Sequence, residues 1–151
     1  MRREGTAGLV SVGYGGRRLS ALVELLTTQN VDVLLDVRLK PVSAIPGFSG
    51  ASLRRSLGAV GIEYRHAVER GNPPENRAPF RDGPVETGRK TFRRILNKGA
   101  ARGRLTDLAL ELTERRVAVL CAERDHERCH RQVIIEELLA LHPGLALTVL
   151  G

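Results

Sequence analysis

Two short runs of residues, 31–37 and 117–121, are almost wholly apolar, and they constrain the fold of this chain more than any other feature. A strand with one face in water alternates apolar and polar residues, whereas a strand covered on both faces is apolar throughout. Further strand-like runs lie at 9–12, 62–68 and 145–149, and helical patterns separate the runs. Strands that alternate with helices predict a mostly parallel sheet of about five strands, with helices on both faces.

The length of the chain suits one such domain. A chain of 151 residues can bury a single hydrophobic core, and the sequence contains no internal repeat. We therefore expect one α/β domain over residues 1–151, with three layers and a Rossmann-like or flavodoxin-like arrangement. No apolar run approaches the ~20 residues of a membrane helix, and the first residues do not resemble a secretory signal. We expect a cytoplasmic protein without a membrane partner, and so small a domain with few aromatic residues could form a homodimer.

Helices and loops are expected between these strands. The helices are predicted from about residue 20 and at 53–60, 89–97, 106–115 and 126–141. Prolines and glycines mark residues 40–50 as a loop and residues 71–88 as a long irregular connection. A connection of that length in a compact domain is usually functional or mobile.

One edge of the predicted sheet gathers most of the chemically reactive residues. In a parallel sheet, ligands bind outside the carboxyl ends of the strands. Four stretches are expected at that edge, at residues 13–18, 36–38, 121–123 and 129–131. The sequence therefore predicts one polar site there.

The first stretch is rich in glycine. Gly13, Tyr14, Gly15 and Gly16 could hold an anion, because glycine lets the backbone approach it and the next helix begins with free N–H groups. The glycine spacing differs from the dinucleotide fingerprint, and no phosphate-loop lysine follows. A phosphate-binding loop and a tight turn both remain open.

The second stretch ends the first apolar run with two charges. An acid such as Asp36 is costly at the end of a buried strand unless it is paired or used in chemistry. Arg38 lies two residues further along on the same face and is the nearest candidate partner. Asp36 could therefore transfer protons while Arg38 binds an anion, or the two could form a structural ion pair.

The last two stretches contain both cysteines. The thiol-phosphatase pattern needs an arginine six residues after its cysteine, and no arginine stands six residues after Cys121. Neighbouring acids would also raise the pKa of the Cys121 thiol. We therefore expect Cys121 to be a small buried hydrophobe that, with Cys129, lines the ligand site. Glu123 and His130 are candidates for proton transfer, and Arg131 could clamp a phosphate or a carboxylate.

A metal site is an alternative for the same residues. Cys121, Cys129 and His130 could supply three ligands, with Glu123 or His66 as a fourth. The eight-residue separation of the cysteines matches no common zinc module, so we predict no metal ligand. Two cysteines without a secretory signal favour reduced thiols over a disulfide. The sequence indicates no particular cofactor.

Basic residues are unevenly distributed. The net charge is +7, and residues 65–104, with 11 cations and four acids, carry all of it. Such a segment could attract nucleic acid or other phosphates. In that case the helix expected at 89–97 would make the contacts, through Arg89, Lys90, Arg93 and Arg94. No aromatic residues alternate with these charges as they do in single-strand binders, so a solvated basic surface is the simpler interpretation.

Several motifs together resemble one known family. They are Gly13-Tyr14-Gly15-Gly16-Arg17, Asp36-Val37-Arg38 with Pro46-Gly47-Phe48-Ser49, Gly61-Ile62-Glu63-Tyr64 with His66, and Leu120-Cys121-Ala122-Glu123 with Cys129-His130-Arg131. In this order, over residues 9–140, they resemble the prokaryotic domain-of-unknown-function 488 family. The resemblance implies a small cytoplasmic α/β protein and no particular reaction. It marks as characteristic positions Asp36, Arg38, His66, Cys121, Glu123, Cys129, His130 and Arg131.

Three functions remain open from the sequence. We favour a small enzyme that binds a phosphorylated or nucleic-acid-related anion at the carboxyl edge of the sheet, with Asp36, Glu123 and His130 as acid and base groups. The first alternative is a non-catalytic nucleic-acid-binding or regulatory module that uses the basic segment 65–104. The second is a metal or thiol site at Cys121, Cys129 and His130.

Overall fold

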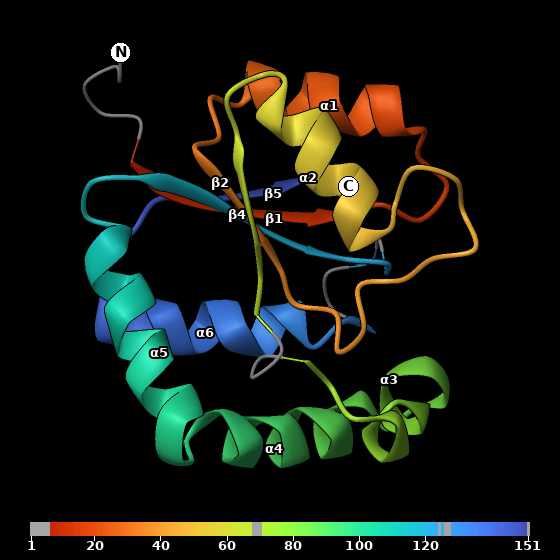
Figure 1. The fold of residues 1–151 in the computed structure, drawn as a ribbon. Coiled ribbons are helices and arrows are strands. Elements are labelled where there is room, and N and C mark those ends of the chain that lie inside the picture. Colours follow the sequence, from red (N-terminus) through yellow and green to blue (C-terminus); the bar gives the residue numbers. More distant parts are fainter. Residues whose placement is uncertain (1–6, 68–70, 124, 126–127, 151) are drawn as a thin grey trace.

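Five parallel strands form the centre of the protein (Figure 1). The computed structural model describes residues 7–67, 71–123, 125 and 128–150. Every strand pair is parallel, and the strand order is β3-β2-β4-β1-β5. The strands are β1 (Gly8–Gly13), β2 (Val33–Asp36), β3 (Glu63–His66), β4 (Arg116–Cys121) and β5 (Leu147–Leu150). The predicted α/β class and the parallel five-stranded sheet are confirmed.

Helices cover both faces of the sheet (Figure 1). Helices α1 (Leu19–Thr28) and α2 (Gly50–Gly58) pack on one face. Helices α4 (Val85–Leu96), α5 (Gly99–Glu111) and α6 (Arg131–Leu141) pack on the other. A 3-10 turn, η2 (Pro74–Asn76), and a short helix, α3 (Ala78–Asp82), precede α4.

The core explains why the apolar runs lack alternation. In β2, Leu34 belongs to the cluster beneath α1 and α2, while Val33 and Leu35 belong to the cluster beneath α4, α5 and α6. Successive side chains of a strand point to opposite faces, so a strand covered on both sides is apolar at nearly every position. Within the described residues, no helix has the length and apolar character that a membrane span requires.

The three-layer arrangement agrees with the prediction, and its strand order, with β4 between β1 and β2, differs from the Rossmann and flavodoxin orders. Two finer predictions are wrong. The connection 71–88 is not irregular throughout, since it contains η2, α3 and the start of α4. Helix α5 begins at Gly99, earlier than the predicted start at residue 106. The glycines at 99 and 103 lower the helix propensity of its first turns, so the sequence did not indicate them.

The chain crossings determine where a ligand site can form. The connection after β1 runs through α1 to β2 over one face, whereas the connection after β4 runs through α6 to β5 over the other. These two strands are neighbours, and their last residues, Gly13 and Cys121, are in register. Their connections leave in opposite directions, which opens a crevice at the carboxyl ends of β1 and β4.

Candidate functional site

A cavity of about 500 Å³ lies at this carboxyl edge. Its size is in the range of small-molecule sites. Residues that follow β1, β2 and β4 line it, together with residues of α3 and the segment before α6. They are Tyr14, Arg38, Leu39, Lys40, Val42, Asn72, Arg77, Phe80, Arg81, Cys121, Ala122, Glu123, Arg128, Cys129 and His130.

The lining of this cavity is strongly cationic. Five of the residues are basic, and Glu123 is the one acid among the described residues that line it. The cations come from three parts of the chain that are far apart in sequence. Arg38 and Lys40 follow β2, Arg77 is the N-cap of α3, Arg81 lies in the last turn of α3, and Arg128 precedes α6. Fixed charges of one sign around a concave surface focus the field on an anion.

Asp36 and Arg38 form a buried ion pair beside the cavity. The Arg38 guanidinium donates to both carboxylate oxygens of Asp36, at 2.8 and 2.6 Å, and to the carbonyl of Phe48 at 2.6 Å. Burial alone would lower the pKa of Arg38, but the hydrogen bond and charge of Asp36 raise it above its ordinary value. The Tyr64 hydroxyl also donates to Asp36, at 2.6 Å, and burial together with that carboxylate raises the pKa of Tyr64. Asp36 does not line the cavity, so the geometry favours the structural ion pair over proton transfer.

The glycine-rich loop is a tight turn. Two of its N–H groups are already used, because Tyr14 donates to the carbonyl of Cys121 at 3.1 Å and Gly15 donates to that of Ala122 at 2.8 Å. Gly16 has φ of +72°, a conformation that favours glycine. Of the four predicted loop residues, only Tyr14 lines the cavity, and its ring stacks on Phe48 with 4.5 Å between ring centroids.

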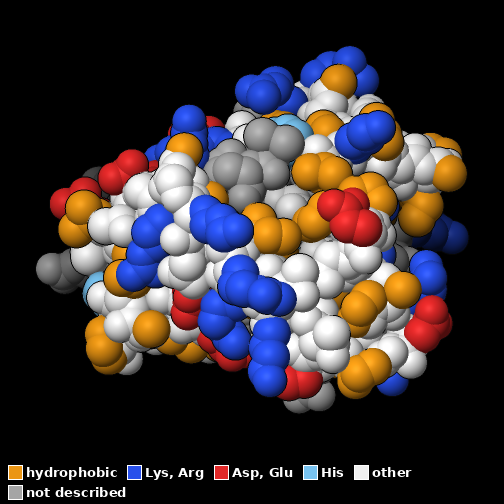
Figure 2. All heavy atoms as spheres, turned by 90° about the horizontal axis from the view of Figure 1, so that it is seen from below, with side chains coloured by type: hydrophobic (Ala, Val, Ile, Leu, Met, Phe, Trp, Pro, Cys, Tyr) orange, Lys and Arg blue, Asp and Glu red, His pale blue; other side chains and the backbone are white. Residues whose placement is uncertain are grey.

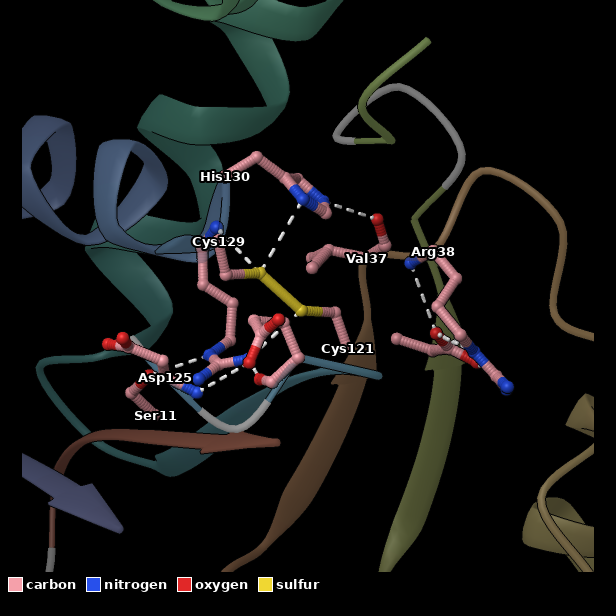
Figure 3. The surroundings of a disulfide bond; sticks show 10 residues. Ser11, Val37, Arg38, Cys121, Asp125, Cys129 and His130 are labelled. Carbon is pink, nitrogen blue, oxygen red and sulfur yellow. Dashed lines mark hydrogen bonds and ion pairs between the residues drawn. A yellow bond between two sulfur atoms is a disulfide. The ribbon is translucent and has the colours of Figure 1, made fainter. Parts of the chain in front are cut away.

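Cys121 and Cys129 are joined as a disulfide at the floor of the cavity (Figure 3). The expectation of two reduced thiols is wrong for this structure. Cys121 ends β4 and Cys129 directly precedes the turn into α6, and both lie at the same edge of the sheet. Both side chains are almost fully buried, yet both border the cavity.

Arg131 supports the sulfur atoms and does not line the cavity. Its guanidinium is fully buried and donates to Sγ of Cys121 at 2.9 Å, to Oγ of Ser11 at 2.9 Å and to the carbonyl of Glu123. Its backbone N–H points at Sγ of Cys129, 3.4 Å away. Burial lowers the pKa of Arg131 to about 10, which leaves it a cation at neutral pH. A cation in contact with sulfur favours the thiolate, opposite to the effect expected from the acidic sequence around Cys121.

His130 is held in one orientation and one tautomer. Its Nε2 lies 2.9 Å from the carbonyl oxygen of Val37, which can only accept, so Nε2 carries the proton. Its Nδ1 therefore has a free lone pair and faces Sγ of Cys129 at 3.6 Å (Figure 3). Burial, with smaller contributions from the charges of Arg131 and Arg77, outweighs the hydrogen bond to Val37 and lowers the pKa of His130 to about 4. The ring is neutral at pH 7.

His66 lies apart from this cavity, and Glu123 lies within it. Nε2 of His66 is 2.7 Å from the carbonyl of Arg38, and its ring borders a separate, smaller cavity near α5. Glu123 lines the main cavity, and its carboxylate accepts the N–H of Asp125 at 2.9 Å. Proton transfer by Glu123 and His130 stays a prediction.

The basic face around α4 is partly neutralised by acids. Figure 2 shows Lys and Arg side chains spread over the face below the sheet, with acidic side chains among them. Arg89 pairs with Glu86, and Arg93 pairs with Glu136 of α6. Lys90 and Arg94 are exposed. Nucleic-acid binding by these four cations stays a prediction.

The sequence did not indicate several residues that line the cavity. They include Lys40, Arg77, Phe80, Arg81 and Arg128. The available signal was the length of the connection 71–88 and the cations within it, because long connections in compact domains are often functional.

Comparison with known proteins agrees with the resemblance found in the sequence. A family model described as "Domain of unknown function DUF488" matches residues 18–138. The chain belongs to this family. The match includes Asp36, Arg38, both cysteines and His130, but it begins after the glycine-rich turn. No curated protein and no solved structure shows a significant match.

Replacement of Asp36 by Asn is expected to lower the free energy of unfolding by about 3–5 kcal/mol, because Arg38 would keep a buried charge without its carboxylate. Equilibrium urea denaturation measures the change. Asp107→Asn, at an exposed position of α5, is the matched control and should stay within about 0.5 kcal/mol of the unsubstituted protein. Equal effects of the two substitutions would show that the ion pair does not organise this edge.

The ring of His130 is expected to titrate at about 4 in the folded, metal-free protein, against an ordinary 6.5. Because the unfolded chain binds the proton more readily, this group stabilises the fold above pH 6.5. That contribution, about 3 kcal/mol, is lost as the pH falls from 6.5 to 4. Imidazole NMR signals recorded against pH with a chelator present give the value, and His130→Gln assigns the signal. Titration near 6.5 would contradict the buried, neutral ring.

Proposed function

We propose that this protein is a small enzyme that binds a phosphorylated small molecule in the cavity at the carboxyl edge of its sheet. One observation carries the proposal: five cations from three separate parts of the chain line a cavity of about 500 Å³, in which Glu123 is the one acidic side chain among the described residues. Such an arrangement suits a compact ligand with more than one negative charge.

The cations are able to reach a ligand. Arg38 is committed to Asp36, but Lys40, Arg77, Arg81 and Arg128 have exposed side chains at the cavity wall. Arg81 pairs with Asp82 and Arg128 with Asp125, both at the surface. Exposed pairs of this kind contribute little to stability, so a phosphate can replace the carboxylates. Arginine also offers two parallel N–H donors, which match the oxygens of a phosphate.

The dimensions of the site favour a small molecule over a polymer. A cavity of this volume admits a ligand of nucleotide size or smaller.

Catalysis is proposed because chemically reactive groups share this cavity with the cations. Glu123 and His130 line it, and the neutral His130 ring can accept a proton or donate a lone pair. These two residues are the remaining candidates for the acid–base role, since Asp36 is committed to Arg38.

Isothermal titration calorimetry with inorganic phosphate, pyrophosphate, AMP and ribose 5-phosphate tests the proposal. At least one probe should bind, and Arg77→Ala or Arg81→Ala should weaken it roughly 10- to 100-fold, since each removes a charge-assisted hydrogen bond. Arg94→Ala on the exposed face of α4 is the matched control and should leave the affinity unchanged.

Two results would contradict this function. One is the absence of binding by all four probes to folded protein. The other is an equal loss of affinity in the Arg77, Arg81 and Arg94 variants, which would indicate attraction by the overall charge.

A further inference from the structure

The floor of the cavity brings together three side chains that can bind a metal ion. Sγ of Cys121, Sγ of Cys129 and a ring nitrogen of His130 all lie within 4.8 Å of one another. Over the part of the chain that the structure describes, this is the one such group of three or more potential ligands. Cysteine and histidine together are the ligands of zinc and related thiophilic ions.

The orientation of His130 suits a ligand. Its Nε2 donates to the carbonyl of Val37, and this leaves the Nδ1 lone pair directed at Cys129 (Figure 3). A histidine that binds a metal usually donates its other ring N–H to a carbonyl or carboxylate, which fixes the ring and the tautomer. That supporting contact is already present without an ion.

The two sulfur atoms have supporting contacts of the same kind. The Arg131 guanidinium lies 2.9 Å from Sγ of Cys121, and the Arg131 backbone N–H lies 3.4 Å from Sγ of Cys129. A nearby cation or N–H donor stabilises a thiolate, and the thiolate is the form of cysteine that binds metal. All three ligand residues border the cavity, so an ion bound to them keeps one side open.

We propose that, once the disulfide is reduced, Cys121, Cys129 and His130 bind one zinc-like divalent ion whose fourth position opens into the cavity. This site goes beyond the proposed function and does not require a bound anion. The disulfide form and the ion-bound form exclude each other, since the same two sulfur atoms make both. Metal occupancy therefore depends on the redox state of the cysteines.

The chemistry balances with a thiol reductant. Two molecules of an external thiol reduce the Cys121–Cys129 bond, which yields two cysteine thiols and the disulfide of the reductant. The cysteines then release two protons to solvent as two metal–sulfur bonds form, while neutral His130 donates a lone pair and releases none. In the ion-bound state His130 is a ligand, which leaves Glu123 as the acid–base candidate beside the open position.

Titration of the reduced protein with Co²⁺, followed by competition with Zn²⁺, tests the site. We expect one Co²⁺ per chain and a thiolate-to-cobalt charge-transfer band. That band reports on this site alone, because the chain contains only two cysteines. Zn²⁺ should displace the cobalt, and the disulfide form of the same protein should show no band. The comparison of reduced and oxidised protein needs no substitution and so does not depend on a variant that folds.

Substitutions locate the ligands. Cys129→Ser should greatly reduce the band, and His130→Gln should keep a band but weaken affinity roughly tenfold or more. His142→Gln, at the far end of α6, is the matched control and should bind as the unsubstituted protein does.

The proposal is overturned if reduced, folded protein takes up less than about one-tenth of an ion per chain, or if Cys129→Ser leaves the band unchanged. Calorimetry with phosphate on the metal-free protein is a separate readout. Cobalt binding without phosphate binding would overturn the proposed function alone, and the reverse result would overturn the metal site alone.

Discussion

The buried ion pair of Asp36 and Arg38 is the interaction on which the carboxyl edge of this protein depends. Asp36 ends β2, and it accepts a hydrogen bond from Tyr64 of the neighbouring strand β3. Arg38 in turn contacts the hydroxyl of Tyr14 after β1 and the carbonyl of Phe48 before α2. One pair therefore connects residues of β2 and β3 and the turn after β1 to the loop at 40–50. A protein with apolar residues in place of both partners could be equally stable. The pair therefore determines the shape of this edge more than it adds to the net stability of the fold.

This organisation separates two chemical environments within one cavity. Exposed arginines and a lysine form the wall, where they meet solvent and can turn toward an anion. Two sulfur atoms and a neutral imidazole form the floor, where burial keeps His130 unprotonated at neutral pH. Charge at the wall attracts a ligand, whereas the floor offers lone pairs. A bound anion would lie between the two.

Much of the sheet and part of the site could be predicted from the sequence. The apolar run at 31–37 indicated a strand covered on both faces, and the rule for strand ends brought Cys121, Cys129 and His130 to one place. Asp36 and Arg38 were recognised as a candidate ion pair because two residues of one strand separated by one position share a face. These predictions depend on local periodicity and on a general property of parallel sheets.

The remaining features depend on contacts between distant parts of the chain. The glycine turn could not be assigned because its N–H groups donate to the carbonyls of Cys121 and Ala122, which lie more than a hundred residues away in sequence. Arg77 and Arg81 reach the cavity through the packing of α3, which local propensity does not reveal. Arg131, expected to clamp a ligand, is instead buried against Ser11 and Cys121.

The central claim is that the cavity at the strand ends, and not the basic face of α4, binds anions. Amide NMR spectra of the whole protein recorded during addition of pyrophosphate test it most directly. We predict that the shifted signals cluster at Lys40, Asn72, Arg77 and Arg81, around the cavity. Shifts confined to Lys90, Arg94 and their neighbours on α4, or no shifts at all, would contradict the account.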